Sequence, residues 1–170
     1  IINRMAYILQ EEKIGYDEQA LHIIARSANG GMRDALSLLD QIISYGSDAV
    51  TFENAVKVSG SLTEEMMISF SSALLHEETE SALQLLQEIL SAGKEAGRFL
   101  EEMILFARDV LVYQQTNGKA FADNTQQYSE AFQTFSQEAP ATFLYGMIEA
   151  FNETQGEMRF STQPDIYLEV

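Results

Sequence analysis

The sequence has no cysteine, no tryptophan and only two prolines. The absence of cysteine excludes a disulfide framework and thiolate chemistry, and it fits a reducing compartment. No run of apolar residues approaches about 18, the length that a membrane-spanning helix needs. The first residues, "IINRMAYILQEEK", have neither a basic leader nor a small-residue cleavage site. We therefore expect a cytoplasmic protein without a membrane partner.

Positive charge is also scarce. The chain carries 10 Lys and Arg against 26 Asp and Glu, a formal net charge of −16. Residues 1–60 hold five basic and eight acidic side chains, whereas residues 61–170 hold five and eighteen. Because phosphate contacts normally need clustered Lys and Arg, the second part should repel DNA and RNA. We expect no direct nucleic-acid binding by this chain.

Apolar residues make up 46% of the 170 positions, and their spacing is helical almost throughout. The sequence predicts an all-α fold with no strand. A first bundle is expected over residues 1–60, where Asp17 caps the second helix. Its helices are predicted at about 1–12, 18–28, from Met32 to near Gly46, and at Phe52–Val58.

A second helical region is expected over residues 61–170. Ser61 and Glu64 fit a capping box for its first helix, which should end near Leu75. Further helices are predicted at about 79–92, with Gly93 as the stop, and at 95–115, followed by a turn at Asn117–Gly118. Later helices should begin near Asp123 and Gln126, at Pro140 and at Pro164.

The longest predicted helix, from about Glu95 to Gln115, has an unusually wide apolar face. Phe99, Met103, Phe106 and Val110 lie on it. Such width indicates contact with several helices or with another subunit. Most of the seven methionines fall on apolar faces like this one, so core filling is favoured over an adaptable groove.

Motifs that would carry chemistry are largely missing. The nearest match to a phosphate-binding loop is Gly93–Lys94, but Glu88 replaces the first glycine and Glu95 the hydroxyl residue. A helix end followed by a solvated lysine is the better interpretation. His22 and His76 are far apart and form no zinc motif, so no metal site is expected.

One stretch stands out, "NGGMRDALSLLDQ" at residues 29–41, where two glycines precede a helix with Arg33 in its first turn. A positive charge there is disfavoured by the helix dipole unless an anion shares the site. The anion could be Asp34 or an external group. From the pattern alone, a tight turn with a surface arginine is also possible.

The segment "GGMRDALSLLDQ" closely resembles the sensor-2 motif of the tau/gamma subunits of bacterial DNA polymerase III, which are AAA+ clamp-loader ATPases. The family usually has Gly-Ser where this chain has Gly30–Gly31. Upstream, "EEKIGYDEQALHIIARSANGG" resembles the family's lid domain. Downstream, the Val58–Ser59–Gly60 junction and the "PDIYLEV" tail resemble its collar domain, so the resemblance covers essentially all 170 residues.

The resemblance implies an AAA+ lid over residues 1–60 and a collar, or oligomerisation, domain over residues 61–170. It implies that Arg33 reaches the ATP phosphates and that Met32 packs near the adenine, with Gly30, Gly31 and Asp34 completing the motif. ATP and Mg²⁺ would be held mainly by an N-terminal ATPase domain that also carries the family's zinc module. This chain would then catalyse no hydrolysis.

The resemblance also implies partners. The collar would assemble with other tau/gamma copies and with the delta and delta-prime subunits, in part through Phe99, Met103, Phe106 and Val110. The sliding clamp and primed DNA would be reached through the ATPase domain. The chain is thus expected to be a fragment of a longer bacterial protein.

Two other classes of function stay open at this point. The chain could be a free-standing helical adaptor in which Arg33 only pairs with Asp34 or Asp40 of its own bundle. It could also be an enzyme, which would require two buried carboxylates to converge in a cleft.

Overall fold

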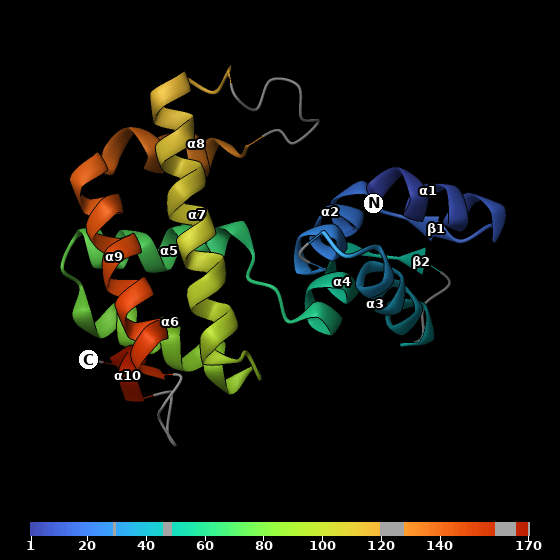
Figure 1. Cartoon of the computed structure of the whole chain (residues 1–170), viewed down its shortest axis with the longest axis horizontal. Helices are drawn as coiled ribbons and strands as arrows, with labels where there is room; N and C mark the ends of the chain where they lie inside the picture. The colour runs from blue at the N-terminus through green and yellow to red at the C-terminus, as the bar shows by residue number, and fades with distance from the viewer. Residues whose placement is uncertain (29, 46–48, 120–127, 159–165, 170) are drawn as a thin grey trace. The chain divides into compact units, whose positions relative to one another are not determined.

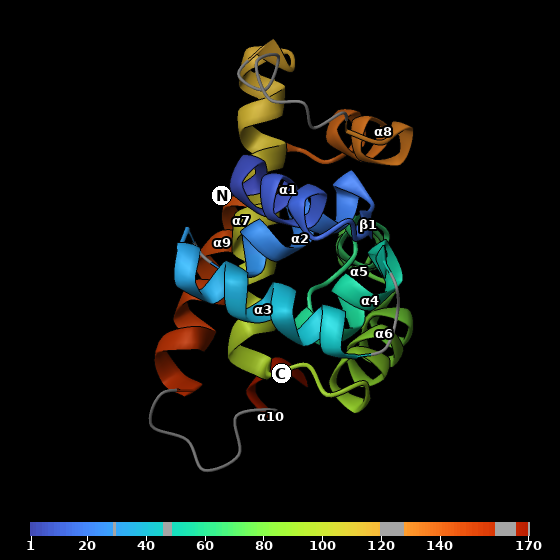
Figure 2. The ribbon, with the colours of Figure 1, turned by 90° about the vertical axis from the view of Figure 1, so that its right-hand side faces the viewer.

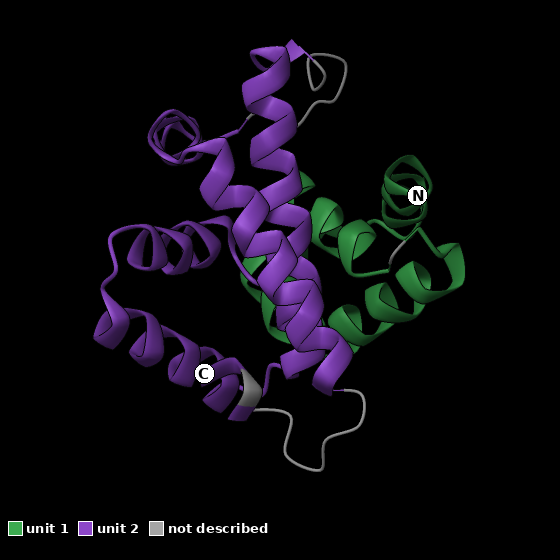
Figure 3. Ribbon diagram, turned by 60° about the vertical axis from the view of Figure 1, so that its left-hand side comes forward, with its two compact units in different colours: residues 1–61 green, residues 62–170 purple. Residues whose placement is uncertain are grey.

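The computed structural model describes residues 1–28, 30–45, 49–119, 128–158 and 166–169. The chain forms two compact units, Ile1–Ser61 and Leu62–Val170, which Figure 3 shows in green and purple. The predicted boundary lay between residues 60 and 61, one position earlier than the boundary between the units.

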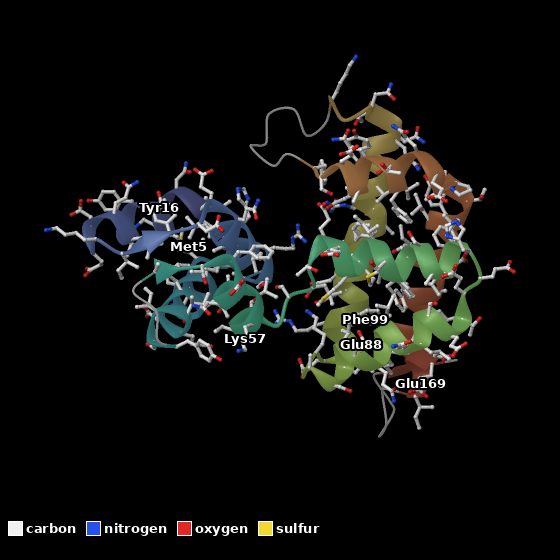
Figure 4. The ribbon with its side chains drawn as sticks, turned by 180° about the vertical axis from the view of Figure 1, so that it is seen from behind. Met5, Tyr16, Lys57, Glu88, Phe99 and Glu169 are labelled. Atoms are coloured by element: carbon white, nitrogen blue, oxygen red, sulfur yellow. The ribbon has the colours of Figure 1, made fainter. Side chains whose placement is uncertain are left out.

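Within its described residues, unit 1 comprises four helices and a pair of very short strands. The elements are α1 (Ile2–Glu11), β1 (Gly15–Tyr16), α2 (Glu18–Ser27), α3 (Met32–Ser44), β2 (Ala49–Val50) and α4 (Phe52–Ser59). Asp17 caps α2 as predicted, since its Oδ1 accepts a hydrogen bond from the Gln19 N–H at 3.0 Å. The core includes Met5, which is labelled in Figure 4.

The two strands are parallel and pair Gly15 with Ala49 and Tyr16 with Val50. The predicted all-α fold is confirmed, although the sequence analysis did not foresee these two short strands. Alternation of polar and apolar residues is recognisable only over four or more residues, and each of these strands has two. Their pairing joins the segment before α2 to the segment before α4.

Unit 2 consists of a further set of helices. They are α5 (Glu64–Leu75), α6 (Thr79–Ser91), α7 (Ala96–Thr116), α8 (Glu130–Glu138), α9 (Ala141–Met158) and α10 (Ile166–Glu169). The predicted turn after α7 is confirmed, since Asn117 and Gly118 have φ of 49° and 76°. The start sites predicted at Asp123, Gln126 and Pro164, and the end predicted near Gly46, lie outside the described residues.

The cap of α5 differs from the prediction. Thr63, not Ser61, caps the helix, because Thr63 Oγ1 accepts a hydrogen bond from the Met66 N–H at 3.2 Å. Ser61 instead pairs through its hydroxyl with Ser27 of α2. Ser61 and Thr63 both carry hydroxyl groups ahead of Glu64. Because the Ser61 hydroxyl is bonded to Ser27, Thr63 serves as the cap.

The long helix α7 supplies more buried residues to the core of unit 2 than any other described helix, and it lies beside α9 (Figure 1). Phe99, Met103, Phe106 and Val110 are all buried, with exposed fractions between 0% and 5%. Phe99 meets Phe70 of α5 edge to face at 5.2 Å between ring centroids, and Phe106 stacks on Phe135 of α8 at 5.8 Å.

This packing answers the question raised by the wide apolar face of α7. The four side chains proposed from the resemblance for a subunit interface fill the core of their own unit, where Phe99 is labelled in Figure 4. Contact with several helices therefore accounts for the width of the face without a second subunit. Five of the seven methionines are buried as well, which confirms core filling.

No described helix combines the length and the apolar character needed to cross a membrane.

Candidate functional site

The segment between α2 and α3 begins with a tight turn. Gly30 has φ of +81°, a conformation that L side chains rarely adopt. The Gly31 N–H donates to the Ala28 carbonyl oxygen at 2.7 Å, which closes the turn. Gly31 is then the N-cap of α3, and its carbonyl oxygen accepts from the Ala35 N–H at 3.0 Å. Arg33 is thereby fixed as the second residue of the helix, on the element that Figure 2 labels α3.

Asp34 lies against this turn. A Cβ atom placed on Gly31 would stand 2.7 Å from Asp34 Oδ2 and 3.1 Å from the Ala28 carbonyl oxygen. The carboxylate therefore folds back over the helix N-terminus, where negative charge is favourable. Asp34 is the acidic residue in the first turn of α3.

Arg33 is exposed and forms no ion pair with any residue that the structure describes, Asp34 and Asp40 included. Its backbone carbonyl accepts a hydrogen bond from Ser37 Oγ at 3.0 Å, which is a contact within the helix. Met32 beside it is 38% exposed. The first turn of α3 thus presents a guanidinium and a thioether to solvent.

Lys94 was considered as a phosphate ligand in the sequence analysis. Gly93, with φ of +94°, ends α6 in a Schellman motif, since the Lys94 N–H bonds to the Ile89 carbonyl and the Gly93 N–H to the Leu90 carbonyl. The helix end is therefore confirmed. The prediction that Lys94 is solvated is wrong, because its side chain is 6% exposed and pairs with Glu102 Oε1.

Burial lowers the pKa of Lys94, although hydrogen bonding to Glu102 opposes this shift. The second carboxylate oxygen of Glu102 accepts the Leu62 N–H at 2.7 Å. The sequence analysis did not find this arrangement. Lys94 lies in the connection before α7 and Glu102 lies within α7, so the periodicity of a single helix does not relate the two residues.

His76 ends α5 and faces α8. Its Nδ1 lies 2.8 Å from the Ser72 carbonyl oxygen and its Nε2 lies 2.8 Å from Glu138 Oε1. The backbone hydrogen bond to Ser72 and the bond to Glu138 raise the pKa of His76. The other histidine, His22, is half-buried in unit 1.

Two further kinds of site were tested against the structure. In the described parts of the chain, no three His, Cys, Asp or Glu side chains gather as a metal would require. No Asp or Glu in those same parts is buried as a whole residue, and the largely buried carboxylate of Glu102 pairs with Lys94, so no pair of buried carboxylates forms an acid–base centre there. These observations give no support to an enzyme with a carboxylate site.

Residues 50–170 match the family model described as DNA polymerase III subunits gamma and tau, domain III. The chain belongs to the gamma and tau family. The remaining part agrees, because residues 1–48 match the clamp loader subunit, ATPase lid domain, of DNA polymerase III. The gamma and tau domain III match begins before α4, although α4 packs on α2 and α3 inside unit 1.

Individual relatives agree with the gamma and tau assignment. DNA polymerase III subunit tau of Bacillus subtilis is 36% identical over 170 residues, which is 100% of this chain and 30% of the relative. Subunit gamma of Buchnera aphidicola is 28% identical over 100% of this chain and 47% of the relative. Subunit tau of Escherichia coli is 34% identical over 61% of this chain and 16% of the relative. The chain thus spans less than half the length of each of these relatives.

The gamma and tau assignment accounts for the predominantly helical fold of both units, and residues 1–48 match the ATPase lid domain. The exposed Arg33 and Met32 lie on α3, within the residues that match the lid. None of the observations on the described residues favours a free-standing adaptor.

Proposed function

We propose that the chain is the lid and collar portion of a clamp-loading ATPase, in which unit 1 senses bound nucleotide through Arg33. The observation that carries the proposal is the exposed guanidinium in the first turn of α3, which no described acid neutralises. A cation at a helix N-terminus opposes the dipole, so this position is favourable only when an anion is present.

A phosphate group suits this position on physical grounds. The helix N-terminus offers free N–H groups and partial positive charge, and the guanidinium adds a planar fork of donors that matches phosphate oxygens. Met32 would lie against the adenine on the same turn. Because Arg33 is carried by the lid, contact with the nucleotide would convert occupancy into lid orientation.

ATP and Mg²⁺ would be held mainly by an ATPase domain outside this chain, with Arg33 as the lid's contribution to the phosphates. The residues present fit that division of labour. They supply an exposed cation in the first turn of α3.

Unit 2 would serve assembly within DNA polymerase III. The partners proposed for it are other tau/gamma copies and the delta and delta-prime subunits. The sliding clamp and primed DNA would be contacted by the ATPase domain. The excess of acidic residues over 61–170 supports this arrangement, since that surface repels phosphate backbones.

The proposal is tested by placing this chain in the tau subunit of Bacillus subtilis in exchange for the matching segment. Arg33→Ala in this chimaera should lower ATP-dependent clamp loading by about tenfold or more, since a charge-assisted hydrogen bond contributes roughly 1.5–3 kcal/mol. Arg33→Lys should recover only part of the activity, because the ammonium keeps the charge and loses the fork.

Arg4→Ala is the matched control, since Arg4 is an exposed arginine of unit 1 that lies over the Tyr7 ring of its own helix. It should leave clamp loading unchanged. Full activity in Arg33→Ala, or an equal loss in Arg4→Ala, would overturn the proposed role of Arg33.

A further inference from the structure

The two units are joined directly at Ser61 and Leu62, and each of these residues is fixed within its own unit. On the unit 1 side, α4 ends at Ser59 and Gly60 follows with φ of +61°. The Ser61 N–H donates to Ser59 Oγ at 3.2 Å, and the Ser61 hydroxyl pairs with that of Ser27 on α2. Ser61, the last residue of unit 1, is 7% exposed, and its contacts with Ser59 and Ser27 hold it to that unit.

On the unit 2 side, the fixed residue is Leu62. Its side chain is 4% exposed within the core of unit 2, and its N–H donates to Glu102 Oε2 at 2.7 Å. This N–H precedes α5, so no helical carbonyl is available to accept it. A carboxylate from α7, forty positions further along the chain, takes that place.

Glu102 is itself held from a second direction. Lys94, in the turn between α6 and α7, pairs with Glu102 Oε1, and the two side chains are 6% and 15% exposed. With both oxygens engaged, the carboxylate has one orientation. Leu62 is therefore bound to a group that is fixed by two separate elements of unit 2.

We infer that Glu102 is a positioning residue that anchors the start of unit 2, so that unit 1 can change orientation only by rotation at the Ser61–Leu62 peptide. The anchors on the two sides leave one peptide link between them. The rotation available to it is ψ of Ser61, because turning about φ of Leu62 would swing the Leu62 N–H away from Glu102. Without Glu102, φ of Leu62 would no longer be held by a hydrogen bond, so a second rotation would be open between the two units.

This inference does not rest on the role proposed for Arg33, because it concerns the backbone connection and involves no nucleotide. Its test uses the 170-residue chain and amide hydrogen exchange read by NMR. The Leu62 amide should be protected in the wild type, although it lies outside any helix. Glu102→Ala should speed its exchange by roughly tenfold or more, since opening there no longer breaks a buried hydrogen bond.

Glu101→Ala is the matched control, because Glu101 is the exposed neighbour on the same helix. It should leave exchange at Leu62 unchanged. Exchange at Phe99 and Met103 of α7 reports on the core and should stay slow in every variant that folds.

Lys94→Met keeps the Glu102 carboxylate and removes its second partner. The exchange rate of the Leu62 amide in this variant should therefore lie between the rates in the wild type and in Glu102→Ala. This variant also serves if Glu102→Ala does not fold. Residual dipolar couplings measured on both units should show a wider spread of relative orientations in Glu102→Ala than in Glu101→Ala.

Two results would overturn the inference. One is slow exchange at Leu62 that survives removal of the carboxylate or of Lys94. The other is an unchanged spread of orientations in Glu102→Ala once loss of protection at Leu62 has been measured.

Discussion

The carboxylate of Asp34 lies directly over Gly31, so close that a Cβ on this glycine would stand 2.7 Å from Asp34 Oδ2. The backbone of Gly31 is nevertheless ordinary, with φ of −80° and ψ of 114°. A side chain at position 31 is therefore opposed by the Asp34 carboxylate, which can rotate, and not by the backbone conformation of residue 31. This distinguishes it from Gly30.

Gly31→Ser should raise the free energy of unfolding by about 0.5 kcal/mol, because a serine at this N-cap gains a hydroxyl acceptor and restricts the unfolded chain. The Asp34 carboxylate has to turn aside to make room. Urea denaturation gives the measurement. A loss of more than about 1 kcal/mol would mean that Asp34 cannot move or that the Ala28 carbonyl, 3.1 Å from the new Cβ, is too close.

Gly30→Ala should do the opposite and lower the free energy of unfolding by about 1 kcal/mol, since alanine is strained at positive φ. A Cβ at this position meets no atom within 4 Å, so the cost is conformational alone. Equal stability of Gly30→Ala and the wild type would show that the turn before α3 adopts another conformation.

Ser71→Ala should raise the free energy of unfolding by about 1 kcal/mol. Ser71 Oγ on α5 is buried, and within the described parts of the chain it has no hydrogen-bond partner, so its removal relieves a desolvation cost. Ser136→Ala on α8 is the contrasting control, because its buried hydroxyl donates to the Phe132 carbonyl at 2.8 Å. Ser136→Ala should be less stable than the wild type. A higher free energy of unfolding in both variants would show that packing, and not the unpaired hydroxyl, is the cause.

The contact of His76 with Glu138 should make stability depend on pH. The pKa of His76 is raised above 6.5 in the folded chain by the Ser72 carbonyl, by Glu138 and by nearby Glu78. The stabilisation is therefore complete below about pH 6.5 and is lost as pH rises through the raised pKa of the folded state. The Tm difference between the wild type and His76→Gln should follow the same course.

His22→Gln controls for the loss of a histidine as such. His22 has no part in the contact with Glu138, so this variant shows the effect of losing a histidine elsewhere in the chain. If the Tm difference of His76→Gln stays flat over the same range, Glu138 does not bind the imidazolium in solution.

Local signals in the sequence were enough to place much of the fold. Asp17 before α2 and Gly93 after α6 act on their own helix ends, so a short stretch of sequence contains all the necessary information. The start of α3, and with it the exposed position of Arg33, follows from the same kind of signal. That the chain belongs to the gamma and tau family was also evident from this stretch, because its motif is local.

Features that depend on tertiary contacts could not be predicted in this way. The sequence of the apolar face of α7 fits a neighbouring subunit and the unit's own helices equally well. The packing of Phe99 against Phe70 and of Phe106 against Phe135 distinguishes the two possibilities. The burial of Lys94 depends on Glu102, whose orientation in turn depends on Leu62. Such a chain of contacts leaves no periodic trace in the sequence.

The short parallel pairing of β1 with β2 has an effect well beyond its own four residues. Tyr16 and Val50 are paired 34 positions apart, and Ser27 and Ser61, at the far ends of the helical segments that follow, are also 34 positions apart. The same number of residues therefore separates Tyr16 from Ser27 as separates Val50 from Ser61, so the strand pairing sets which residues meet at the other ends of the two segments. Inserting one residue within α4 would carry Ser61 past Ser27, and the chain would leave unit 1 from a different place.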